Sequence, residues 1–191
     1  MPESQPAPAT VVPGWKRIFG FALDPGGAVN GTLGNAPLAE AMAVPAMAFG
    51  LFFLQTGLDR ARAGTIDGAG VAMLVLAGLA LGTLGLVIVA GLGWGAIRAF
   101  GGTAAFGTAL RAFALSYSPT LISVMLGMIF NLTFGWNTAI AFGATGVLWA
   151  LGPMSGAIRQ MLDGRLWPAI MVSSLCGLEI LLAWAWLGAM A

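Results

Sequence analysis

The sequence lacks histidine altogether, has a single cysteine and carries few charged residues. Eight Lys or Arg and seven Asp or Glu among 191 residues make 8% charged residues, whereas an average soluble domain has roughly a quarter. Without histidine, Ser-His-Asp and Cys-His catalysis and histidine-ligated metals are excluded. Cys176 alone cannot form an internal disulfide. We therefore expect no enzyme, no metal and no cofactor, and the net charge of +1 offers no field that would attract nucleic acid.

Apolar residues and glycine are abundant in the sequence. Hydrophobic residues make up 59% of the chain, and there are 29 glycines. This composition provides too little polar surface to cover a soluble globule. Soluble enzymes and disordered chains are thereby excluded, and the sequence predicts an all-α integral membrane protein whose first partner is the lipid bilayer.

Five stretches are long and apolar enough to cross a membrane as helices, which takes about 20 residues. The first 14 residues are Pro-rich, so we expect a flexible tail rather than a cleavable signal peptide. Residues 15–191 then form a single transmembrane domain. Its predicted spans cover residues 38–57, 69–97, 110–130, 136–152 and 167–190.

A short amphipathic segment precedes the first span. Trp15, Ile18, Phe19 and Ala22 share one stripe of a helix, and the basic pair that follows Trp15 lies off that stripe. We expect this helix to lie in the headgroup plane of the membrane.

Basic residues predict the orientation of the spans. An odd number of spans places the two termini on opposite sides. The side of the N-terminus collects six basic residues, whereas the other side has only Arg60 and Arg62. Because cytoplasmic loops are enriched in Lys and Arg, we expect a cytoplasmic N-terminus and an external C-terminus.

Glycine and proline mark expected contacts and bends of the helices. Spaced glycines allow close packing of helices in lipid, within the chain or between copies. The candidates are Gly78, Gly82, Gly85, Gly143 and Gly146. Pro45 and Pro119 each remove a backbone donor inside a span, so kinks are expected there.

Two groups of polar residues inside the spans are candidate sites. The first surrounds Pro119 and contains Ser116, Tyr117, Ser118, Thr120 and Ser123. Its hydroxyls could satisfy the backbone groups that Pro119 frees, or could form a polar path or a partner-binding face. The second is Glu179, the one ionisable residue deep inside a span, which we expect to be protonated and hydrogen-bonded into the bundle. It could transfer protons or contact a ligand, or it could be a neutral carboxyl that fixes helix packing.

Several motifs follow one another in an order known from a family of five-span proteins. A short helix ends at Pro25, Pro37-Leu38 opens the first span, and Gly101-Gly102 precedes Phe106, Leu110 and Arg111. The third span contains Ala114-Leu115-Ser116-Tyr117-Ser118-Pro119. This arrangement resembles the bacterial branch of the Yip (Ypt-interacting protein) domain family. The acidic Asp-Leu-Tyr-Gly-Pro segment of the eukaryotic members is absent, so a Rab-type GTPase is not expected as a partner.

The resemblance implies a non-enzymatic integral membrane protein, and the eukaryotic relatives act in membrane organisation and trafficking through partner binding. Short loops, glycine faces and the interfacial helix lead us to expect a membrane scaffold or interaction protein of the bacterial inner membrane, which assembles with copies of itself or with other membrane proteins. An alternative from the residues themselves is a small transporter, channel or lipid-handling protein. In that alternative Glu179, the kinked third span, Asn131 and Asn137 would line a path. This alternative predicts a cavity that reaches Glu179 from one side, and a tightly packed bundle with Glu179 sealed by apolar neighbours would contradict it.

Overall fold

The computed structural model describes residues 13–23 and 36–190, with side chains described as far as residue 182. Most of the predicted N-terminal tail lies outside these residues. The described part of the chain contains helices and their connections, and no strand. In order these are α1 (Gly14–Leu23), α3 (Leu38–Arg62), α4 (Gly68–Ala99), α5 (Phe106–Ser116), α6 (Ser118–Phe134), α7 (Ala139–Met161) and α8 (Leu166–Met190). The expected all-helical fold is confirmed.

Four helical stretches are long and apolar enough to cross a membrane: Leu38–Arg62, Gly68–Ala99, Phe106–Phe134 and Ala139–Met161. The C-terminal helix α8 is apolar and is shorter over the part with described side chains, Leu166–Leu182. These helices indicate an integral membrane protein. The 32 residues of α4 make a rod of about 48 Å, which exceeds a hydrocarbon core of about 30 Å.

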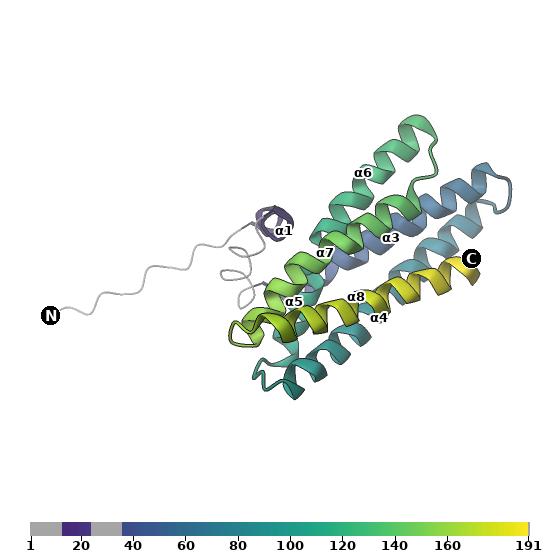
Figure 1. Cartoon of the computed structure of the whole chain (residues 1–191). Coiled ribbons are helices and arrows are strands. Elements are labelled where there is room, and N and C mark those ends of the chain that lie inside the picture. Colours follow the sequence, from purple (N-terminus) through teal and green to yellow (C-terminus); the bar gives the residue numbers. More distant parts are fainter. Residues whose placement is uncertain (1–12, 24–35, 191) are drawn as a thin grey trace.

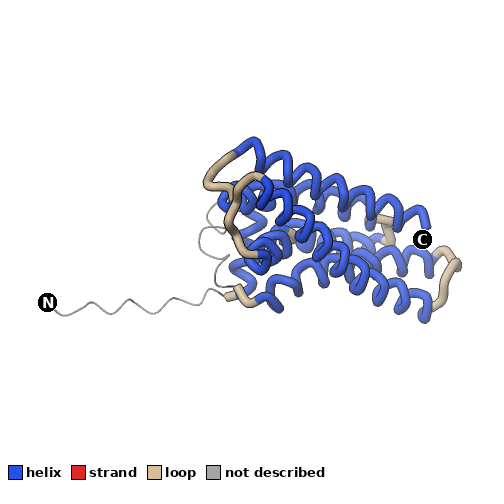
Figure 2. Tube along the Cα trace, turned by 90° about the horizontal axis from the view of Figure 1, so that it is seen from below, coloured by secondary structure: helices blue, strands red, loops and turns tan. Residues whose placement is uncertain are grey.

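The helices lie side by side as an elongated bundle (Figures 1 and 2). Helix α3 packs against α4, α5 and α6, and α7 packs against both α6 and α8. Helix α8 also contacts α4. The α3–α4 connection, the α6–α7 connection and the end of α8 lie together at one end (Figure 1).

Local signals set several helix ends. The carboxylate of Asp67 accepts the backbone N–H of Gly70 over 2.8 Å and so caps the N-terminus of α4. Gly135 ends α6 with a left-handed φ of 68°, a conformation that glycine adopts without steric cost.

The predicted third span is two helices rather than one. Helix α5 ends and α6 begins around Tyr117, just before Pro119, which occupies the first turn of α6. Because proline cannot donate to Leu115, the hydroxyl of Ser118 donates to that carbonyl instead, over 2.7 Å. Pro45 lies inside the continuous helix α3.

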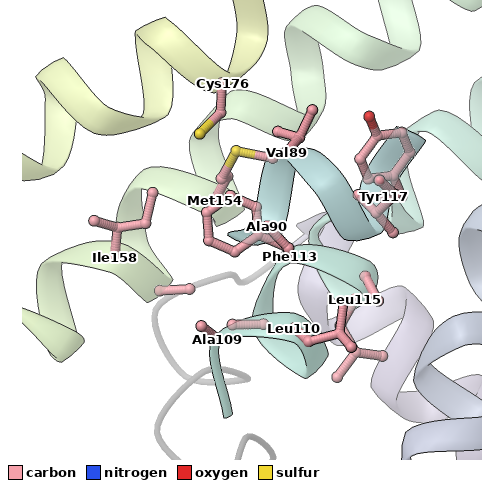
Figure 3. Packing of buried hydrophobic residues seen from close by; sticks show 14 of the residues in the cluster. Val89, Ala90, Ala109, Leu110, Phe113, Leu115, Tyr117, Met154, Ile158 and Cys176 are labelled. Carbon is pink, nitrogen blue, oxygen red and sulfur yellow. The ribbon is translucent and has the colours of Figure 1, made fainter. Parts of the chain in front are cut away.

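The predicted fourth span ends too early. Helix α7 continues through Pro153 to Met161 instead of stopping at residue 152. The reason is burial, because Met154, Ala157 and Ile158 lie in the core together with α5 (Figure 3). Tertiary packing maintains the helix beyond the proline that had suggested its end.

One face of helix α1 packs against the bundle, whereas the sequence predicted a helix that lies only in the headgroup plane. Phe21 is fully buried, and Arg17 forms an ion pair with Glu40 of α3 over 3.1 Å. Trp15 and Phe19 point outward and are exposed. The predicted stripe is therefore divided, with Ala22 buried on the bundle side and its aromatic members outside.

A candidate ligand cavity beside a buried polar network

A cavity of about 690 Å³ lies between α3, α4, the start of α7 and α8. Its apolar lining includes the buried side chains of Phe49, Phe53, Leu86, Val89 and Ile180, and Ile140 of α7, which is 76% exposed, forms part of its open rim. Its other end is polar and is formed by Thr56, Asp59, Arg60, Thr65 and Asn137. Thr65 and Asn137 are exposed, so the polar end reaches the surface where α3 and α4 connect.

The size and the polarity of the cavity match a small amphiphile. Ligand-binding cavities measure about 300–1,000 Å³ and are mostly apolar with a few polar groups. From Asp59 to Phe49, α3 spans ten residues, which corresponds to about 15 Å along the helix. The cavity could therefore hold an apolar chain within the bundle and a polar head at its surface.

Tyr117 lies at the apolar end of the cavity. Its ring centroid is 5.7 Å from that of Phe49, and only 1% of the residue is exposed. Its hydroxyl has no hydrogen-bond partner among the described residues. The junction of α5 and α6 thus supplies the wall of the cavity that faces α3.

Glycines of α4 shape the cavity and the contact beside it. A Cβ added to Gly78 or Gly82 would overlap the ring of Phe53 or Phe49, so both glycines allow α3 and α4 to pack closely. Gly85 lines the cavity, and a Cβ there would meet nothing within 4 Å. On α7, Gly143 is buried, and a Cβ at Gly146 would come within 2.7 Å of the Thr120 backbone.

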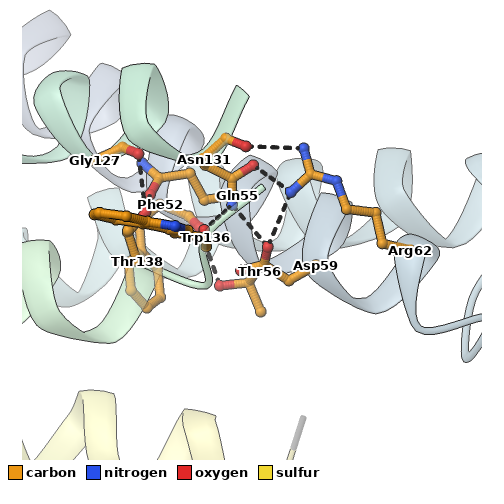
Figure 4. A network of polar contacts seen from close by, with 9 residues as sticks. All are labelled: Phe52, Gln55, Thr56, Asp59, Arg62, Gly127, Asn131, Trp136 and Thr138. Carbon is orange, nitrogen blue, oxygen red and sulfur yellow. Dashed lines mark hydrogen bonds and ion pairs between the residues drawn. The ribbon is translucent and has the colours of Figure 1, made fainter. Parts of the chain in front are cut away.

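Asn131 of α6 is the centre of a polar network next to the polar end of the cavity (Figure 4). Its side-chain amide donates to Asp59 Oδ1 over 2.7 Å and to the Trp136 carbonyl over 3.1 Å. Arg62 donates to Asn131 Oδ1 over 2.9 Å and to the Asn131 carbonyl over 3.1 Å. These bonds join the end of α3 to the end of α6, and Arg62 is a second donor to the Asn131 carbonyl, which also accepts the backbone N–H of Gly135.

Gln55 and Thr138 continue the network deeper into the bundle (Figure 4). Gln55 is fully buried and donates to the Val124 carbonyl over 2.8 Å. The hydroxyl of Thr138 lies 2.9 Å from the Gly127 carbonyl and 3.3 Å from Gln55 Oε1. Most polar groups in this part of the bundle are therefore satisfied within it, as burial in an apolar medium requires.

The candidate polar residues around Pro119 do not form one site. Ser116 and Ser118 donate to carbonyls of their own chain segment, and Ser123 donates to the Phe142 carbonyl over 2.7 Å. The hydroxyl of Thr120 is buried without a partner among the described residues. Of this group, Tyr117 alone lines the cavity.

Glu179 of α8 does not line the cavity, although the neighbouring residue Ile180 does. Its Oε2 is buried and has no hydrogen-bond partner in the described part of the chain. The hydrogen bond that we expected for Glu179 is thus absent at this oxygen.

The cavity residues of α3 were not among the sites predicted from the sequence. In the sequence, Arg60 and Arg62 indicate only the orientation of the spans, and Gln55 and Asp59 belong to no predicted site. A usable signal was present, because polar residues at positions 55, 56, 59 and 60 interrupt an apolar helix. Of the two asparagines in the predicted polar path, Asn137 lines the cavity and Asn131 lies in the network beside it.

No protein-family model, curated protein or solved structure matches the chain. The resemblance to Yip-domain proteins therefore stays a prediction. Among the described residues, no group of His, Cys, Asp or Glu could hold a metal ion.

Proposed function

We propose that the protein binds a lipid-like amphiphile within the membrane and has no enzymatic activity. The observation that supports this proposal best is the cavity of about 690 Å³, apolar in the bundle and polar where it reaches the surface. Burial of an apolar chain there would contribute about 0.8 kcal/mol for each methylene. This function corresponds to the lipid-handling alternative, with the cavity in place of Glu179 as the binding site.

The orientation of the cavity follows from the proposed topology. If α8 completes a fifth span and the N-terminus is cytoplasmic, Arg60 and the polar end of the cavity face the outside of the cell. A bacterial inner membrane is the proposed location. The protein would then take up or present an amphiphile at the outer leaflet. The interaction-scaffold hypothesis stays a separate prediction, and the oligomeric state of the purified protein in detergent would test it.

Filling the cavity tests the proposal. Gly85→Phe would place a ring in the open space beside Gly85, whereas Gly91→Phe places the same ring on the same helix where a Cβ also meets nothing within 4 Å, outside the cavity lining. The probes are cis-parinaric acid and the alcohol with the same fluorescent chain, titrated into purified protein. We expect Gly85→Phe to lower the affinity for both probes at least tenfold and Gly91→Phe to leave both affinities unchanged. Equal binding to both variants and the parent protein would contradict the proposal.

A further inference from the structure

Two charged residues of α3, Asp59 and Arg60, line the polar end of the cavity, and Arg62 lies beside it in the polar network. Asp59 and Arg62 lie 3.4 Å apart, and both contact Asn131 on the side of α6. The hydrogen bond of 2.7 Å from Asn131 to Asp59 Oδ1 keeps this carboxylate on that side. The charges of Asp59 and Arg62 therefore offset one another within the polar network.

Arg60 is the charge that remains. Its backbone carbonyl accepts two bonds from Thr65, from the N–H and the hydroxyl, each over 3.0 Å. Its guanidinium forms no hydrogen bond or ion pair with any residue in the described ranges, although it lies partly buried against the cavity. The other nearby carboxylate, Asp67, caps α4 through Gly70 instead. The cavity therefore has an uncompensated cation at its polar end.

An anionic head group would complement this cation. A guanidinium holds a carboxylate or phosphate through two parallel hydrogen bonds, and such charge-assisted bonds are stronger where water is partly excluded. The carboxamide of Asn137, which has no side-chain partner among the described residues, lines the same end and could donate a further bond. A neutral head group would leave the guanidinium unpaired.

We propose that Arg60 binds the carboxylate of a single-chain fatty acid whose chain occupies the apolar part of the cavity. This inference rests on the proposed function and specifies its ligand. One unpaired guanidinium matches the single charge of a carboxylate better than a phosphate monoester, which carries about −1.5 to −2 at neutral pH. A cavity of about 690 Å³ is also suited to one chain.

The test compares head groups on one chain. Purified protein is titrated with cis-parinaric acid, with the corresponding alcohol and with the monoalkyl phosphate of the same chain. We expect the acid to bind at least tenfold more tightly than the alcohol. Arg60→Gln should remove this difference and leave the alcohol unchanged, and Arg60→Lys should restore part of it because the charge is kept and the two-pronged geometry is lost.

The outcomes separate the two proposals. If acid and alcohol bind equally and Gly85→Phe weakens both, the binding function stands and the role of Arg60 is overturned. If the phosphate binds tenfold more tightly than the acid and depends on Arg60, a fatty acid is overturned as the ligand. If no probe binds the parent protein, the proposed function itself fails. Folding of each variant is checked by the protection of Cys176, the single and buried cysteine, from a thiol-reactive dye.

Discussion

Replacing Asn131 with leucine should destabilise the bundle more than any change at the surface of α6. Asn131→Leu keeps the size of the side chain but removes three hydrogen bonds, to Asp59, to Arg62 and to the Trp136 carbonyl. The side chain of Asp59 is only 12% exposed, and its second oxygen already lacks a partner among the described residues. After the substitution, only the longer contact with Arg62 would compensate this carboxylate.

The size of the effect follows from these contacts. A hydrogen bond to a charged group contributes about 1.5–3 kcal/mol, and one between neutral groups about 1 kcal/mol. The side chain of Arg62 is 41% exposed, so solvent screening reduces its share to a few tenths of a kcal/mol. We expect a loss of about 3 kcal/mol, most of it from Asp59. For a chain of this length this corresponds to a decrease in Tm of roughly 6–12 °C.

Cys176 provides the assay. It is the single cysteine and is 3% exposed, so a thiol-reactive fluorophore reports unfolding in detergent without any engineered label. The control is Thr133→Leu, an exposed position on the same helix, where the Tm should change by less than 2 °C. A decrease below 2 °C for Asn131→Leu would refute the reasoning. So would a double-mutant cycle with Asp59→Ala that shows no coupling between the two residues.

Two further predictions concern backbone packing and use the same assay. Gly82→Ala should lower the free energy of unfolding by about 1–3 kcal/mol because the added methyl group overlaps the ring of Phe49. Gly91→Ala, where the added methyl group meets open space, should instead stabilise α4 by about 0.5–1 kcal/mol. Changes of the same sign in the Tm of both variants would contradict the close contact at Gly82. Ser118→Ala should cost about 1 kcal/mol because the carbonyl freed by Pro119 loses its only donor among the described side chains, and an unchanged Tm would show that the hydroxyl is dispensable.

The length of the apolar runs was enough to locate the helices, but not to predict where each helix ends. Hydropathy located α3, α4 and α7 because a helix in lipid must be apolar over about 20 residues. It could not show that α5 ends around Tyr117 or that α7 continues past Pro153, since both depend on which neighbours a residue is packed against. Proline indicated a disturbance at both places, and tertiary contacts decided whether the helix broke.

The cavity could not be predicted from residue types, because two residues of the same type on the same helix can have different neighbours in the fold. Gly82 and Gly85 belong to one predicted set of packing glycines. The ring of Phe49 occupies the space beside Gly82, whereas Gly85 faces open space. Similarly, Arg60 and Arg62 have equal weight in a count of basic residues, although Arg62 is bound to Asn131. Their difference arises from the position of α6, which is far away in the sequence.

The polar network and the cavity depend on one another through Asp59. This carboxylate is adjacent to Arg60 in the sequence, and if it were free it could neutralise that cation and compete with an anionic ligand. The bonds to Asn131 and Arg62 hold it on the side of α6. The network thus stabilises the contact between α3 and α6 and, by the same bonds, keeps Arg60 available at the cavity.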